Sequence, residues 1–142
     1  MNLLITLLLN TAHADHNLKQ GWFWETSPNI EICPDSNISI NKVNETIDYW
    51  SSRGIEVKIN DIIEVDYCDL EKRNVIQIMG HGRTNVKWYY YGRTKSESTL
   101  YIKASRIQIP NDTLNNETIV KHEFGHALGL EHTNDSIMTP YH

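Results

Sequence analysis

Three histidines and one glutamate near the end of the chain have the residue types and the spacing of a metal centre. His122 and His126 are four residues apart, so on a helix both imidazoles lie on one face and can reach one ion. Glu123 lies beside the first histidine, within reach of a water molecule on that ion. Gly129 lets the chain leave the helix through a conformation that a Cβ disfavours, and this exit returns His132 as a third ligand. Three protein ligands leave a fourth position for water, which is typical of a catalytic zinc.

The stretch that contains these residues resembles the extended zinc-binding signature of the metzincin clan. Residues 122–132 read H-E-F-G-H-A-L-G-L-E-H and match H-E-x-x-H-x-x-G-x-x-H. Met138 follows in S-I-M-T-P-Y, which looks like the Met-turn that lies under the zinc in that clan. The residues around the ligands are most similar to the matrixins, the matrix-metalloproteinase-like family. The resemblance covers residues 118–141. A helix with two core or exposed histidines is the simpler alternative, but it does not explain the extended match.

The resemblance implies a secreted zinc-dependent endopeptidase with one catalytic Zn²⁺ and a protein or peptide substrate. His122, His126 and His132 would hold the ion, which activates a water molecule and polarises the scissile carbonyl. Glu123 would be the catalytic general base, taking the proton from that water and later delivering it to the leaving amine. Matrixins often carry a second, structural zinc held by histidines and an aspartate. Only His81 is available in the corresponding region, so we expect no second zinc.

Two other function classes remain as alternatives. One is a zinc-binding module with little activity, whose sequence mark would be the loss of Glu123, and Glu123 is present. The other is a narrow-specificity effector or toxin protease, which the same site residues would serve. Tyr141, just after the Met-turn, is a candidate either for approaching the zinc or for walling the specificity pocket.

The metal-binding residues need a helix that buries one side and presents the other to a cleft. Asn115 or Asn116 is expected to begin this helix, with Glu117 near its positive end. Apolar residues recur at i, i+4, i+7 and i+8 and form its core stripe: Val120, Phe124, Ala127 and Leu128. The two histidines and the glutamate lie off this stripe, so we expect them to face the cleft.

The remaining elements are expected to form a sheet and a second helix. A stripe with spacings of three, four and three predicts that helix, begun by Asn37 or Ser39 and ended by Gly54: Ile40, Val43, Ile47 and Trp50. Alternating or continuous apolar residues predict strands at 30–32, 55–59, 74–79, 86–91 and 99–109. The aromatic cluster at 22–24 is interpreted as cover for the core, with a binding surface as the alternative.

This order of elements resembles that of a matrixin catalytic domain. The resemblance implies an α/β (α+β) fold, metzincin-like, with a twisted, mostly parallel sheet, one antiparallel edge strand and two main helices. The zinc helix comes near the C-terminus. The edge strand would bind an extended peptide by strand addition above the zinc, and the strand from Val86 to Tyr91 is our candidate for it.

Length, composition and charge limit the class of protein. The 142 residues suit one small domain, and 39% hydrophobic with 22% charged residues is ordinary for a globular chain. The net charge of -5 gives no basic footprint, so we expect no nucleic-acid partner. No stretch is long and apolar enough for stable insertion in a membrane. We expect a monomer.

The first fourteen residues read as a signal peptide. Leu3 to Leu9 is a short apolar run, and Ala12-His13-Ala14 has the small-x-small form of a cleavage site. The alternative is a disordered segment or a buried strand at the N-terminus. We therefore expect a signal peptide at 1–14 and a metallopeptidase catalytic domain at 15–142. The mature protein would be secreted to the extracellular space or the periplasm.

Two further groups of residues are relevant to the compartment and to metal binding. Cys33 and Cys68 are the only two cysteines, and in an exported protein they favour one disulfide over two buried thiols.

The acidic residues Asp61, Glu64, Asp66, Asp69 and Glu71 lack the spacing of an EF-hand loop. A solvated acidic face is preferred to a calcium site.

Overall fold

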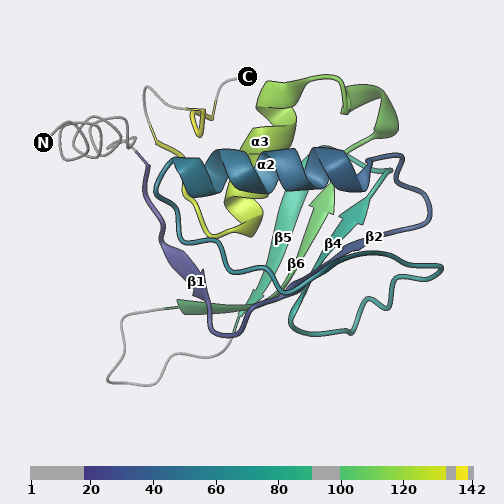
Figure 1. Ribbon diagram of the computed structural model, residues 1–142, viewed down its shortest axis with the longest axis horizontal. Coiled ribbons are helices and arrows are strands. Elements are labelled where there is room, and N and C mark those ends of the chain that lie inside the picture. The colour runs from purple at the N-terminus through teal and green to yellow at the C-terminus, as the bar shows by residue number, and fades with distance from the viewer. Residues whose placement is uncertain (1–17, 91–99, 134–136, 141–142) are drawn as a thin grey trace, which may run out of the picture.

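A computed structural model describes residues 18–90, 100–133 and 137–140 (Figure 1). The elements in chain order are β1 (Trp22–Trp24), β2 (Asn29–Ile32), α2 (Ile40–Ser52), β3 (Ile62–Glu64), β4 (Val75–Met79), β5 (Asn85–Tyr90), β6 (Leu100–Gln108), a 3₁₀ turn (Asn111–Thr113) and α3 (Glu117–Ala127). The predicted signal peptide at 1–14 and Tyr141 lie outside the described residues.

The strands form one six-stranded sheet in which only β5 runs antiparallel to its neighbour. The order is β3-β2-β4-β6-β5, and β1 pairs with the first residues of β6. Strand β5 bonds to β6 through residues 85–90 and lies at the edge of the sheet. The prediction of a mostly parallel sheet with one antiparallel edge strand is therefore confirmed, and β5 falls at the predicted position.

Both long helices lie on the same side of the sheet (Figure 1). Helix α2 begins where Ser39 Oγ accepts a hydrogen bond from Lys42 N (3.0 Å), and it ends before Gly54, whose φ of 83° a glycine tolerates. Helix α3 packs against β5 and β6, and α2 packs against β3 and α3. The predicted stripe of α2 is buried at Val43 and Trp50, although Ile40 remains 37% exposed.

Trp50 joins the two helices at the centre of the core. Its side chain is fully buried, and its indole N–H donates to the carbonyl of Lys121 in α3 at 2.9 Å. The core stripe of α3 is buried as predicted, with exposures from 0 to 2% for Val120, Phe124, Ala127 and Leu128. The position of α3 over the sheet is thus fixed from its apolar side, and its other side is left for the site.

The predicted strand at 55–59 is wrong. Residues 55–61 have no regular structure, and the strand beside β2 is β3, where Ile62 pairs with Ile30. The alternation of Ile55, Val57 and Ile59 has another cause: these side chains pack against the core while the chain crosses from α2 to the sheet. The aromatic cluster at 22–24 was interpreted as core cover. Trp24 does pack against the core, but the cluster also forms a strand that was not predicted.

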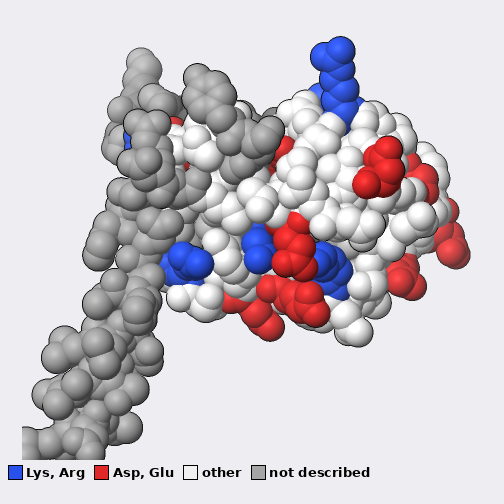
Figure 2. Space-filling model, turned by 90° about the horizontal axis from the view of Figure 1, so that it is seen from above, with Lys and Arg blue, Asp and Glu red and all other residues white. Residues whose placement is uncertain are grey.

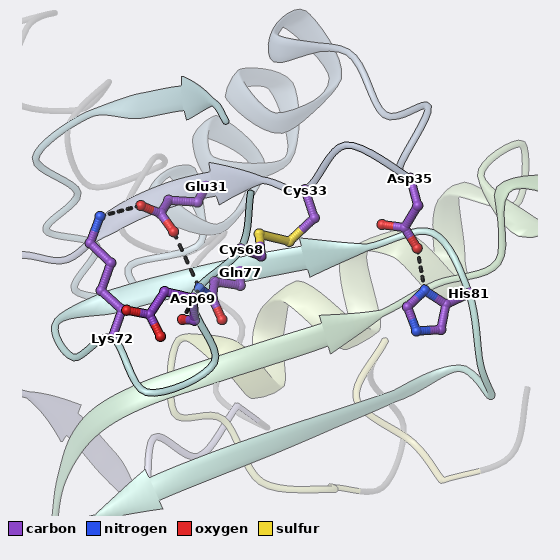
Figure 3. Close-up of a disulfide and its surroundings, with 8 residues drawn as sticks. All are labelled: Glu31, Cys33, Asp35, Cys68, Asp69, Lys72, Gln77 and His81. Carbon is purple, nitrogen blue, oxygen red and sulfur yellow. Dashed lines mark hydrogen bonds and ion pairs between the residues drawn. A yellow bond between two sulfur atoms is a disulfide. The ribbon is translucent and has the colours of Figure 1, made fainter. Parts of the chain in front are cut away.

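The predicted disulfide between Cys33 and Cys68 is present and joins the end of β2 to the loop after β3 (Figure 3). Further contacts hold this loop against strands β2 and β4. The buried carboxylate of Glu31 accepts from Lys72 Nζ at 2.5 Å and from Gln77 Nε2 at 3.2 Å, and Gln77 also donates to the carbonyl of Asp69. The five acidic residues of 61–71 are all exposed, as predicted for a solvated face.

The surface mixes charges of both signs. Basic and acidic side chains lie next to one another on the face seen in Figure 2. One ion pair joins α2 to α3, where Glu117 accepts from Lys42 at 2.5 Å, and a second lies within α3, where Glu117 is 3.7 Å from Lys121 Nζ. None of the helices in the described part of the chain has the length and apolar character of a membrane span.

Candidate metal centre and active-site cleft

Helix α3 carries the first two histidines and begins where the sequence indicated. Asn116 is the N-cap, and its side-chain oxygen accepts from Ile119 N at 3.2 Å. Glu117 follows in the first turn, at the positive end of the helix dipole. His122 and His126 then lie one turn apart, opposite the stripe that packs on the sheet.

The three histidines converge on one point. Nε2 of His126 lies 3.0 Å from Nε2 of both His122 and His132, and the latter two nitrogens are 3.3 Å apart. Nitrogens held at 2.0–2.1 Å by one tetrahedral zinc are separated by about 3.3 Å. The triangle of nitrogens therefore fits a single ion, and the same three residues are the group that could hold a metal among those described. Two are buried and His132 is exposed.

Hydrogen bonds on the far side of two rings fix which nitrogen faces the shared point. Nδ1 of His122 lies 2.9 Å from the carbonyl oxygen of Ile137, and Nδ1 of His126 lies 2.8 Å from that of Leu130. A carbonyl only accepts, so each Nδ1 carries the proton and each Nε2 keeps its lone pair. This is the usual arrangement around a histidine that binds zinc.

Gly129 gives the chain the exit that returns His132 to the other two. Its φ is +104°, and a Cβ there would come within 2.0 Å of the carbonyl oxygen of Trp22. The backbone of Gly129 is also held from the N-terminal segment, because Gly21 N donates to its carbonyl oxygen at 2.9 Å. The predicted role of this glycine is thus confirmed, and the close approach of Trp22 adds a second reason for it.

Met138 packs against the middle of α3, between the turns that carry His122 and His126. Its side chain is fully buried, and its carbonyl accepts from Thr133 N at 3.1 Å. A Cβ on Gly125, in the middle of α3, would lie 2.6 Å from the sulfur of Met138 and 2.8 Å from the ring of Trp50. The absence of a side chain at Gly125 therefore lets Met138 approach the helix.

The histidines open into a cleft of about 690 Å³. Its lining combines α3, the start of β5, the N-terminal segment and the chain after the helix: Trp22, Thr84, Asn85, Val86, Ile119, His122, Glu123, His126, Glu131, His132 and Pro140. Glu123 lies in this cleft with the three histidines, as predicted, and β5 forms one wall.

The comparison with protein families decides the classification. A family model described as Matrixin matches residues 31–142, which is most of the chain. The protein belongs to the matrixin family. A search of curated proteins found no match. Membership supports zinc metallopeptidase activity in general, since the family is zinc-dependent.

Burial sets the protonation of two groups in the matrixin site. It raises the pKa of the Glu123 carboxyl to about 7, because the charged form loses solvation. Burial also lowers the pKa of His126 to about 4, and the neighbouring imidazoles of His122 and His132 lower it further. His126 is therefore neutral at pH 7, the form in which an imidazole binds a metal.

The sequence did not indicate every residue of this region. Trp22 and Glu131 line the cleft because the N-terminal segment pairs with the chain after α3, through the bridge between Gln20 and Leu130. No local pattern signals a contact over that separation. His81, which no aspartate follows closely in the sequence, pairs through Nδ1 with the carboxylate of Asp35 from the turn after β2 (Figure 3). The prediction of no second zinc is not tested by this pair.

Proposed function

We propose that this matrixin is a secreted endopeptidase that hydrolyses peptide bonds with one zinc ion held by His122, His126 and His132. The observation that carries the proposal is the triangle of Nε2 atoms, because its dimensions suit one ion and leave a side open to the cleft. A zinc ion bound there would supply Lewis acidity, lowering the pKa of water and polarising a carbonyl group.

Glu123 is the proposed general base. Its carboxylate accepts a proton from a water molecule in the cleft and afterwards donates that proton to the nitrogen of the leaving amine. A pKa near 7 suits both steps, because the carboxyl group exchanges its proton readily at neutral pH. A zinc ion close to the carboxylate would act against the effect of burial and favour the charged form.

The edge strand β5 is proposed to hold the substrate. Thr84, Asn85 and Val86 line the cleft, and β5 pairs with β6 on one side only among the described residues. An extended peptide can add to such an edge through main-chain hydrogen bonds, which would carry its scissile bond past the histidines. A substrate held this way is a peptide or an extended loop of a protein.

Export is part of the proposal. We infer that residues 1–14 are removed as a signal peptide and that a monomeric catalytic domain of residues 15–142 acts in the extracellular space or the periplasm. The disulfide between Cys33 and Cys68 supports this, because such bonds persist in oxidising compartments.

One experiment tests the activity directly. The purified protein is incubated with a broad peptide library, with and without a zinc chelator, and cleavage is read by mass spectrometry. We expect chelator-sensitive cleavage at internal peptide bonds. Cleavage that survives the chelator would contradict the proposal. A protein that holds zinc and cleaves nothing would instead be a zinc-binding module, and cleavage restricted to one folded protein would identify a narrow-specificity protease.

A further inference from the structure

Strand β3 forms the edge of the sheet farthest from the cleft, and this edge is open. Within the described ranges β3 pairs with β2 and with no other strand. Asp61 O and Val65 N bond to β2, and alternate residues of a parallel strand bond to the same neighbour. The backbone N–H and C=O groups of Ile62 and Glu64 therefore point away from β2, toward the position of a further strand.

The side chains of this edge are accessible. Ile63 is 37% exposed, and Glu64 is exposed as well. One outward donor, the N–H of Ile62, is covered by the carboxylate of Asp61 at 2.9 Å. That carboxylate belongs to the preceding, exposed residue, so a backbone carbonyl from an added strand can replace it without disturbing the sheet.

A groove of about 410 Å³ runs beside this edge, between α2 and the chain that leads into β3. Two asparagines and Asp61 line it, and most of its exposed surface is polar, although the other lining residues are aliphatic: Ile40, Ile47, Val57, Ile59 and Ile62. Ile62 and the buried Ile30 share the face covered by the helices. A strand added to β3 would therefore place alternate side chains over the groove.

The charge of the edge selects the occupant. Residues 59–71 contain five carboxylates and no lysine or arginine. A second copy of this chain would bring like charges together across the junction, which is unfavourable in paired strands. A segment that carries lysine or arginine at alternate positions would instead place its charges on one face, where they meet Glu64.

We propose that the free edge of β3 and the adjoining groove bind an extended, lysine- and arginine-rich segment of a partner protein by strand addition. The segment alternates basic residues, which lie over the groove on the face shared by Ile62 and Glu64, with apolar residues, which lie beside the exposed Ile63 on the other face. The site lies at the opposite edge of the sheet from the cleft and does not depend on the proposed proteolysis.

The test uses the zinc-loaded Glu123→Ala protein, so that a bound probe is not cut. The probe is a fluorescent peptide of about six residues, a usual strand length, with alternating valine and lysine. Fluorescence anisotropy should detect binding that weakens as salt is added. A probe with glutamate in place of lysine should not bind. A lysine probe that is N-methylated on its pairing nitrogens should bind much more weakly, since it cannot form the strand hydrogen bonds.

Variants of β3 locate the site. Glu64→Lys with Asp66→Lys should weaken binding by about tenfold or more. The control pair, Glu25→Lys with Glu45→Lys, makes the same change in net charge at exposed positions elsewhere and should alter it by no more than about twofold. Glu64→Pro removes an outward N–H, which an edge strand tolerates, and should weaken binding more than Glu64→Gln does. Circular dichroism checks that each variant is folded.

Several results would overturn the proposal. Equal binding of the N-methylated probe would show attraction by charge alone, without strand addition. Equal losses in the two charge-reversed pairs would show that no particular edge is used. If none of the β3 variants changes the affinity for the probe, the probe binds elsewhere, for example on β5. Sedimentation that shows a dimer, dissociated by Glu64→Pro, would make a second copy the occupant.

Discussion

Glu123 and the three histidines line the same cleft, but they differ in the chemistry for which they are suited. The histidines meet through Nε2 atoms whose tautomers are fixed by the carbonyls of Ile137 and Leu130. Glu123 is not part of that triangle and carries a carboxyl group with a raised pKa. The proposed mechanism therefore assigns metal binding and proton transfer to different side chains, and mutagenesis can separate the two.

We predict that Glu123→Ala keeps its zinc and its fold but loses hydrolysis by a factor of roughly 10² to 10⁴, the usual share of general acid–base catalysis. Steady-state cleavage of a library-derived peptide gives the rate, and elemental analysis gives the metal. The matched control is Glu117→Ala, which removes an exposed carboxylate from the first turn of the same helix. If the Glu123→Ala protein cleaves at the wild-type rate, the base has been assigned to the wrong residue.

The three histidines and Glu123 could be predicted from the sequence because their spacing is local, whereas Trp22 and Glu131, which also line the cleft, could not. His126 comes four residues after His122 on the helix, and Gly129 follows three residues later, so the arrangement of these residues depends mainly on local backbone geometry. The role of Gly125 was not predictable. The groups that exclude a side chain there, Met138 and Trp50, reach it only through the tertiary fold.

At the scale of the elements, long apolar patterns predicted the secondary structure correctly, whereas the shortest strands were missed. The stripes of α2 and α3 and the apolar run of β4 extend over enough residues to specify their structure. Strands β1 and β3 have three residues each, too few for a periodicity to show. The alternation at 55–59 looks like a strand, yet it arises where an irregular segment packs on the core, because packing and not pairing decides which side chains are buried.

Helix α3 is also where two local effects oppose each other. Gly125→Ala should strengthen the helix by about 0.8–1.0 kcal/mol through intrinsic propensity. The added Cβ meets the sulfur of Met138 and the ring of Trp50 at distances of 2.6 and 2.8 Å, and overpacking of a core costs about 1–3 kcal/mol. We predict that overpacking dominates and that chemical denaturation shows a lower free energy of unfolding. A variant more stable than wild type would mean that Met138 moves aside freely.

The disulfide constrains the loop that follows β3 by joining it to the end of β2. It closes a separation of 35 residues, and loss of that constraint on the unfolded chain should cost ~3–4 kcal/mol. We predict this decrease for Cys33→Ala with Cys68→Ala, measured by urea denaturation. In the wild-type protein, thiol labelling after denaturation without reductant should find no free cysteine. Two labelled cysteines in exported material would contradict the disulfide seen here.

For the whole molecule, the metal centre links segments that are far apart in the chain. His122 and His126 belong to α3, while His132 lies beyond the glycine exit and beside the N-terminal segment. An ion that binds all three in the folded protein but not in the unfolded chain shifts the equilibrium toward the folded state. The proposed zinc should therefore stabilise the fold as well as support the chemistry.

We predict that zinc at about 100 times its dissociation constant adds roughly 2.7 kcal/mol to the free energy of unfolding. For a domain of this size, that stabilisation raises the melting temperature by roughly 10 °C. Differential scanning calorimetry with and without a chelator measures the shift. The Glu123→Ala protein should keep the whole shift, because a general base is not a ligand, whereas His126→Ala should lose it together with the bound zinc. A shift that persists in His126→Ala would place the stabilising ion elsewhere, and its loss in Glu123→Ala would make that carboxylate a ligand instead of the base.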